Sequence, residues 1–380
     1  MKAASIILWL VTSPVPLAAQ SPLFIPAPGS PFPLSSSPGN VVAGDVNRDH
    51  KVDLLIASGK SHSVFVLLGD GKGGFTQPTN SPIRTAQSPS EMALAEFNGD
   101  GDPDMAFIDH NLYDVVVLVG DGRGNFAPAP GSPFKARDGT HPHTHGLAAA
   151  DINADGKQDL VTANNEDGDL AVLLGDGKGG FARAPGSPFA VGKSPYPLAV
   201  GDLNGDTAPD IAVPNSGPEN RTITVLLNDG KGVFRPAPKS PFEVAEAPFF
   251  VAIGDVNGDQ SMDLVATHDD RSLASILLGD GQGSYKLAPN SPADLGGKAW
   301  GVVVADVDGD GSADLVAAAN DDARVLLGDK RGNFKPAPGS PYPAGKGAWR
   351  LAVADFNGDD RLDIATSNLE SDSVTILLRK

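Results

Sequence analysis

The 380-residue sequence contains no cysteine, which excludes a disulfide framework, a thiolate metal site and a cysteine nucleophile. Basic residues are also scarce, because 29 Lys and Arg stand against 47 Asp and Glu and give a formal net charge of −18. Such a charge disfavours a nucleic-acid surface. The motifs GxSxG and HExxH and a phosphate-binding Gly loop before a helix are missing too. No catalytic residue is therefore predicted.

Long apolar runs are absent except near the N-terminus, so no segment is expected to span a membrane. There, Lys2 precedes the short apolar segment 3–11, and residues 17–19 (LAA) offer a small-residue cleavage site. We interpret residues 1–19 as a signal peptide and residues 20–380 as a single domain. The alternative is a buried N-terminal helix. The mature protein is expected to be a monomer in a secreted, periplasmic or extracellular location, where calcium is plentiful.

Glycine and proline are abundant, with 45 and 33 copies, and they point to many turns rather than long helices. An acidic motif, DVDGDGSADL from Asp306, recurs with variations from residues 45, 96, 151, 202, 255 and 355. The copies are 49 to 55 residues apart, a period that predicts a repeat architecture. A second motif, such as LLGDGKGGF ending at Phe75, and a Pro-rich tail, such as residues 127–134 (APAPGSPF), follow within each complete repeat.

Each repeat predicts four short strands. In the fourth repeat they are residues 198–202, 210–214 and 222–227 and a last strand near Phe234. The residue before every acidic loop is Gly or Ala, which suits the innermost strand of radially arranged blades. The last repeat lacks its final strand, whereas residues 24–32 (FIPAPGSPF) match residues 126–134. We therefore predict an all-β, seven-bladed β-propeller of four-stranded antiparallel blades, whose ring is closed by the N-terminal strand completing the last blade.

The acidic loops carry oxygen-bearing side chains at positions 1, 3, 5 and 9, and they resemble the start of an EF-hand loop. All-oxygen donors with three carboxylates favour a hard cation, calcium over magnesium. We predict up to seven calcium ions; the alternative is a set of Asp/Asn turns that bind nothing. The predicted metal ligands are Asp45, Asn47, Asp49, Asp53, Glu96, Asn98, Asp100, Asp104, Asp151, Asn153, Asp155, Asp159, Asp202, Asn204, Asp206, Asp210, Asp255, Asn257, Asp259, Asp263, Asp306, Asp308, Asp310, Asp314, Asp355, Asn357, Asp359 and Asp363.

The seven loops are not equivalent. Position 6, where glycine eases the sharp turn, is Gly only in the second, third and sixth loops. In the second loop, Glu96 is one carbon longer than the aspartate of the others. We expect the first, second and fourth loops to bind most weakly.

The acidic loop, the small-residue strand before it and the LLGDGxGxF run resemble the FG-GAP or VCBS repeats of integrin α-chain propellers. The resemblance covers nearly all of the mature chain. It implies a propeller whose loops hold calcium and stabilise the blades without performing chemistry. Secreted members of this family include lectin-like propellers, so a glycan or an extracellular protein is the partner that the resemblance suggests.

A ligand-binding face is predicted at the opposite end of the ring from the acidic loops. Six residues before the acidic loops, five of seven positions carry rings, and these rings should crowd around the channel mouth beside polar loops. The alternative is that they only pack the funnel. The predicted ligand-binding residues are His145, Tyr196, Phe249, Trp300, Trp349 and Arg350.

His141, His143 and His145 alternate in the segment HPHTH, so in an extended strand they would face one side at a spacing that suits zinc, copper or nickel. The alternative is an exposed loop with incidental histidines. The other histidines, His50, His62, His110 and His268, lie in separate predicted loops and indicate no site. We predict a binding module for glycans or a protein partner. A secreted polysaccharide lyase or hydrolase acting at the channel mouth, or a structural envelope protein, remain the alternatives.

Overall fold

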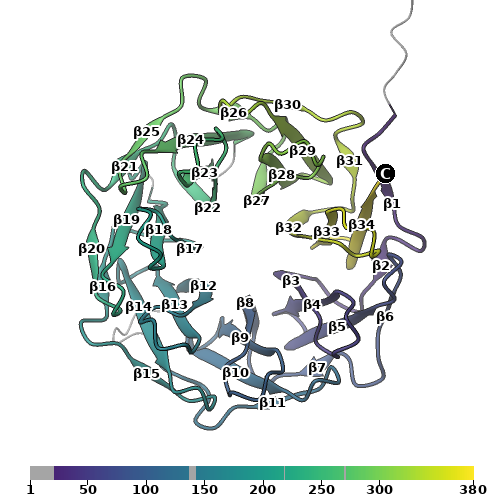
Figure 1. Cartoon of the computed structure of the whole chain (residues 1–380). Coiled ribbons are helices and arrows are strands. Elements are labelled where there is room, and N and C mark those ends of the chain that lie inside the picture. The colour runs from purple at the N-terminus through teal and green to yellow at the C-terminus, as the bar shows by residue number, and fades with distance from the viewer. Residues whose placement is uncertain (1–20, 137–142, 218, 269–270) are drawn as a thin grey trace, which may run out of the picture.

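The computed structural model describes residues 21–136, 143–217, 219–268 and 271–380. Their strands form seven antiparallel sheets arranged as blades around a central channel (Figure 1). The described residues contain no helix, and therefore none that is long and apolar enough to cross a membrane. The predicted all-β, seven-bladed propeller is confirmed.

In every blade the first three strands follow one another outward from the channel in sequence order. The innermost strands are β3 (Val41–Gly44), β8 (Pro89–Ala95), β12 (Thr144–Ala150), β17 (Ala199–Gly201), β22 (Pro248–Gly254), β27 (Ala299–Ala305) and β32 (Ala348–Ala354). The second strands are β4 (Asp53–Ser58), β9 (Asp104–Asp109), β13 (Asp159–Asn164), β18 (Asp210–Asn215), β23 (Asp263–His268), β28 (Asp314–Ala319) and β33 (Asp363–Asn368). The third strands are β5 (Ser63–Gly69), β10 (Val115–Gly120), β14 (Asp169–Gly175), β19 (Thr222–Asn228), β24 (Leu273–Gly279), β29 (Asp322–Gly328) and β34 (Ser373–Arg379).

The outer strands are short. The fourth strands of the first six blades are β6 (Phe75–Thr76), β11 (Phe126–Pro128), β15 (Phe181–Arg183), β20 (Phe234–Pro236), β25 (Tyr285–Leu287) and β30 (Phe334–Pro336). A further two-residue strand pairs with the third strand of six blades: β2 (Phe32–Pro33), β7 (Ile83–Arg84), β16 (Phe189–Ala190), β21 (Phe242–Glu243), β26 (Ala293–Asp294) and β31 (Tyr342–Pro343). Sequence analysis missed these pieces, since residues in a Pro-rich tail carry no strand signal.

The Pro-rich tails are tied to the blades by a repeated side-chain contact. Each tail contains a cis Ser-Pro peptide bond, and the serine hydroxyl accepts a hydrogen bond from an amide of the third strand. In the first blade the Val66 amide donates to Ser81 Oγ at 2.9 Å, and in the last blade the Ile376 amide donates to Ser30 Oγ at the same distance. The recurring SP dipeptide therefore fastens the outer edge of every blade.

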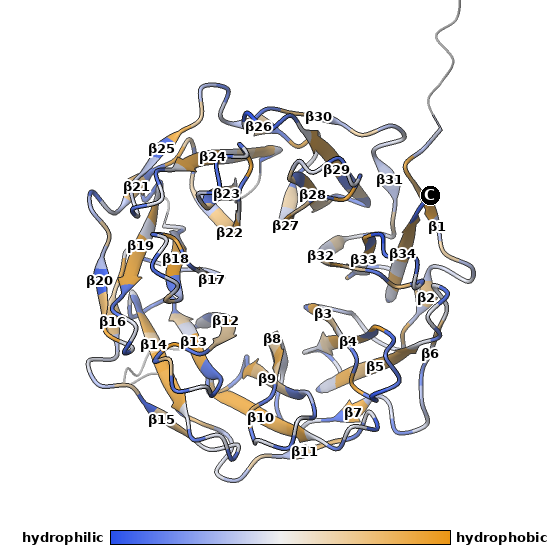
Figure 2. Ribbon diagram, viewed as in Figure 1, coloured by the Kyte–Doolittle hydropathy of each residue, from blue (hydrophilic) through white to orange (hydrophobic). Residues whose placement is uncertain are grey.

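Packing between blades explains the residue pattern of the strands. The second strands are buried along their whole length, and Figure 2 shows apolar residues concentrated in strands such as β10 and β19, with polar residues in the loops. The innermost strands lie close together around the channel, where side chains must be small. A Cβ atom on Gly254 of β22 would lie only 2.4 Å from Val304 Cγ1 of the next blade, so a larger residue there would force Val304 to move.

The ring closes as predicted. β1 (Phe24–Pro26) pairs antiparallel with β34, with Phe24 opposite Arg379 and Pro26 opposite Leu377. Phe24 is only 2% exposed and its ring meets the edge of Tyr342 at 5.4 Å between centroids. The first and last described strands thus share one blade, which Figure 1 shows beside the C-terminus.

Candidate functional site

The two ends of the ring carry different groups of residues. Because neighbouring strands are antiparallel, the acidic loops between first and second strands all lie at one end. The segments that enter the first strands, and the loops between second and third strands, lie at the other end. We call this second end the channel mouth.

The acidic loops are ordered by hydrogen bonds to their own carboxylates. In the sixth loop, Asp306 Oδ1 accepts hydrogen bonds from the amides of Gly309 (2.7 Å) and Asp310 (3.1 Å), and Asp306 Oδ2 accepts one from Gly311 (2.8 Å). The buried Asp314 bridges the blade, because its two oxygens accept from Val307 (2.9 Å) and Gly328 (2.8 Å). The ninth-position aspartate therefore links the acidic loop to the third strand by hydrogen bonds.

The sixth loop has the donor set that a hard cation requires. Asp306, Asp308 and Asp314 each offer a carboxylate oxygen, and these oxygens lie within 4.8 Å of one another. Among the described residues, no other set of three His, Cys, Asp or Glu side chains brings its ligand atoms this close together. Burial, opposed by backbone hydrogen bonds and assisted by the charge of Asp308, raises the pKa of Asp314 to about 6. A bound cation would offset this unfavourable burial of charge, so the residues fit calcium.

The remaining loops share the buried aspartate but differ in their surroundings. Burial raises the pKa of each ninth-position aspartate to about 6, namely in Asp53, Asp104, Asp159, Asp210, Asp263 and Asp363. In the first loop Lys51 Nζ lies 3.1 Å from Asp49, and Arg48 forms an ion pair with Asp102 of the second loop. Lys51 thus contacts a predicted ligand, whereas Asp102 is not one, and the calcium site at each loop stays a prediction.

The acidic loops also differ in the residue at position 6. His50, Thr207, Gln260 and Asp360 adopt φ values of 62°, 70°, 69° and 61° there, a left-handed conformation that favours glycine. The loops are folded alike despite this substitution, so the missing glycine costs stability without changing the turn.

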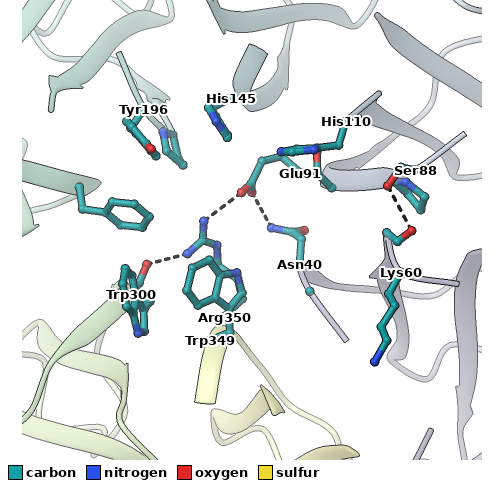
Figure 3. A pocket seen from close by; sticks show the side chains of 16 residues that line it. Asn40, Lys60, Ser88, Glu91, His110, His145, Tyr196, Trp300, Trp349 and Arg350 are labelled. Atoms are coloured by element: carbon teal, nitrogen blue, oxygen red, sulfur yellow. Dashed lines mark hydrogen bonds and ion pairs between the residues drawn. The ribbon is translucent and has the colours of Figure 1, made fainter. Parts of the chain in front are cut away.

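At the channel mouth, the structure gathers the predicted ligand-binding residues around a cavity of about 630 Å³. His145 stacks on Tyr196 with centroids 4.9 Å apart and planes at 8°. Tyr196 meets Phe249 at 4.9 Å, Phe249 meets Trp300 at 5.3 Å, and Trp300 meets Trp349 at 4.7 Å. These five rings form one continuous aromatic arc contributed by five successive blades. Figure 3 labels four of them, His145, Tyr196, Trp300 and Trp349.

The polar side of the cavity is formed by hydrogen-bonded charged and amide side chains, which we call the polar chain. Arg350 of β32 donates to Glu91 Oε1 of β8 at 2.9 Å and to the Trp300 carbonyl at 2.7 Å. Asn40 Nδ2 donates to Glu91 Oε2 at 2.9 Å (Figure 3). Glu91 and Asn40 were not predicted as site residues, because only the folded ring brings them opposite residue 350.

Within the described residues, two buried polar atoms of these three side chains have no hydrogen-bond partner. They are Asn40 Oδ1 and Arg350 Nε. The amide orientation of Asn40 follows from its partner, because an ionised carboxylate only accepts, so Nδ2 must face Glu91 and Oδ1 must face away. Both atoms are buried in the wall of the cavity, so another molecule could reach them only if that wall rearranged.

The structure adds one histidine to the predicted group. His141 lies outside the described residues, while His143 and His145 lie together with ring centroids 5.5 Å apart. His110, which sequence analysis set aside, joins them at 6.2 Å from His143 and 6.0 Å from His145. Burial lowers the pKa of His145 to about 4 and also lowers that of His110. His110 was missed because it belongs to the preceding repeat and has no local signal of its own.

The repeats match a known family. An FG-GAP-like repeat model matches residues 45–107, 96–162, 151–213, 255–317 and 306–366. The chain belongs to this family. The matched segments of this FG-GAP propeller each run from one acidic loop past the next, so every match contains two copies of the acidic motif. No curated protein matches the chain.

Solved structures support the fold. An Agrocybe aegerita lectin that recognises non-reducing terminal N-acetylglucosamine is 20% identical, with a TM-score of 0.54 and coverage of 89% of this chain and 87% of the lectin. BBS1N, solved in complex with ARL6DN, is 13% identical, with a TM-score of 0.62 and coverage of 94% and 98%. A putative 6-phosphogluconolactonase from Bacteroides uniformis is 14% identical, with a TM-score of 0.60 and coverage of 83% and 89%. At these identities the similarity establishes the architecture alone, which fits an interaction module.

Proposed function

We propose that this FG-GAP propeller is an exported, calcium-stabilised binding module and that it binds glycans at the channel mouth. The observation that carries the proposal is the pairing of the aromatic arc with the polar chain of Asn40, Glu91 and Arg350 in one cavity. The cavity, about 630 Å³, lies within the usual range of small-molecule sites.

A sugar ring has the two kinds of surface that this cavity offers. Its C–H face is apolar and packs on aromatic rings, and its hydroxyl groups both donate and accept hydrogen bonds. The hydroxyl groups of a sugar would meet the polar chain of Asn40, Glu91 and Arg350, which lines the cavity. The similarity to a lectin of known sugar specificity supports a glycan over other small molecules, although the shared feature is the fold.

Calcium has a structural role in this proposal. The acidic loops lie at the end of the ring away from the cavity, so a cation there would hold the blades together and would not touch the ligand. The apolar N-terminal segment supports export into a compartment that contains calcium.

A glycan array tests the proposal, with the wild-type chain applied in calcium and in chelator. We expect retention of a defined set of glycans, no product formation, and at least a tenfold loss of affinity in Tyr196→Ala and Trp349→Ala. Leu112→Ala is the matched control, since Leu112 is 57% exposed on the β9–β10 loop and is not among the residues lining the cavity.

Two results would overturn the proposal. One is the absence of any retained glycan from a chain shown to be folded, and the other is equal binding by the control and the arc variants. Release of a shortened or unsaturated sugar would instead favour a lyase or hydrolase at the same mouth.

A further inference from the structure

Three histidines from two blades lie together beside the channel mouth. His110 follows β9 in the second blade, and His143 and His145 stand at the start of β12 in the third blade. The three ring centroids are 5.5, 6.0 and 6.2 Å apart, so every pair of rings is adjacent. We propose that His110, His143 and His145 form a binding site for a borderline transition-metal ion such as Zn²⁺.

The spacing of the rings suits a three-histidine site. With Zn–N bonds of about 2.0–2.1 Å in tetrahedral geometry, three imidazole centroids around one ion lie roughly 5 Å apart. The observed separations exceed this value by roughly 1 Å or less, but the ring nitrogens of the three histidines do not all lie within 4.8 Å of one another, so the side chains must rotate to bind an ion. A fourth position would remain for water or a ligand, since the His110 and His145 rings line the cavity.

A second observation that supports the site is a carboxylate next to one of the histidine rings. His143 Nδ1 lies 3.5 Å from Glu166 Oε1, a residue of the β13–β14 loop. Histidines that bind metals usually donate their other ring N–H to a carboxylate, which fixes the tautomer and leaves the far nitrogen free for the ion. Glu166 is placed to do this for His143, so Nε2 of that ring would face the other two.

The chemistry of the donors separates this site from the acidic loops. Three imidazole nitrogens favour zinc, copper or nickel, whereas the all-oxygen loops favour calcium. The two sets of residues also lie at opposite ends of the ring. Saturating calcium should therefore leave the histidine site available.

The test is a Zn²⁺ titration of the full chain by calorimetry in excess calcium, repeated with Co²⁺ and followed by visible absorption. We expect one tightly bound Zn²⁺ per chain and Co²⁺ bands typical of tetrahedral nitrogen ligands. Affinity should fall at least tenfold in His110→Ala and His143→Ala, and 10- to 100-fold in Glu166→Gln. His143 and Glu166 are about half exposed, so these two variants are expected to fold.

His62→Ala is the matched control, because His62 occupies the corresponding β4–β5 loop of the first blade and its Nδ1 contacts the Gln87 carbonyl. It should retain Zn²⁺ binding fully. Unchanged Zn²⁺ affinity in the His110 and His143 variants, an equal loss in the His62 variant, or no tight Zn²⁺ in the wild type would each overturn the site.

Discussion

The last residue of each second strand is buried at the channel-mouth end of its blade, and polar side chains at this position make hydrogen bonds within the blade. Three blades use asparagine, and Asn368 donates to Thr375 Oγ1 at 3.0 Å and to Ser373 Oγ at 3.1 Å. The fifth blade uses His268, which is fully buried and lies with Nε2 2.9 Å from Ser275 Oγ. Ser275 occupies the place of Thr375, so the same contact is made by a titratable ring.

Replacing His268 with asparagine should make the protein less sensitive to acid. Burial lowers the pKa of His268, with Glu246 as the facing charge that opposes the shift. The unfolded chain therefore binds the proton more readily, and the wild type loses stability as the pH falls through about 6.5. Between pH 7.5 and 5.5, His268→Asn should gain on the wild type by at most about 1.4 kcal/mol. Urea unfolding at each pH in saturating calcium measures the gap, and a gap that does not change with pH would refute the account.

The strand that closes the ring connects residues far apart in the sequence. Phe24 and Ile25 alternate in β1, where Phe24 is buried against Tyr342 and Ile25 is 38% exposed. The Lys380 amide also donates to the Leu23 carbonyl at 3.0 Å. The closure is thus made of both buried apolar surface and main-chain hydrogen bonds, and it holds the last blade complete.

Truncating the buried Phe24 side chain should lower the stability of the folded ring. We expect Phe24→Ala to lower the free energy of unfolding by about 3–5 kcal/mol, through lost burial and the cavity left behind. Ile25→Ala, one residue along the same strand, should cost less than about 1 kcal/mol. Guanidinium unfolding followed by tryptophan fluorescence checks both variants. Equal losses for the two would mean that β1 contributes through its backbone alone.

The elements were predictable from sequence to the extent that they repeat. The motif at Asp306 and the match between residues 24–32 and 126–134 predicted the blades, their order and the closure. The two-residue strands in the Pro-rich tails were not predicted, because tertiary pairing with the third strand creates them. At the mouth, the residue six before each acidic loop was found by periodicity, whereas Asn40, Glu91 and His110 depend on contacts between blades that no local pattern encodes.

At the scale of the whole molecule, the ring concentrates negative charge at one end. Six loops place three ligand-position carboxylates each on tight turns and the sixth loop places four, and the chain carries a formal net charge of −18. Seven dications would offset 14 of these charges. Without them, each buried ninth-position aspartate sits near other carboxylates, as Asp314 does beside Asp308. Like charges at close range destabilise the folded state, so the blades are expected to depend on a cation.

Chelation should therefore lower the melting temperature, and magnesium should not restore it. A ligand that binds only the folded state adds about 2.7 kcal/mol per site at 100 times its dissociation constant, so even one filled loop should shift Tm by several degrees. The sixth loop should contribute most, since Asp308 is its third-position ligand where the other loops have asparagine. Asp308→Asn gives that loop the donor set of its neighbours and should weaken the tightest calcium site without unfolding the protein. Calorimetric melting with calcium, magnesium or chelator measures the shift, and calcium titration of the variant measures the affinity. An identical Tm in all three conditions would mean that the loops are turns stabilised by their own hydrogen bonds, as the contacts of Asp306 already permit.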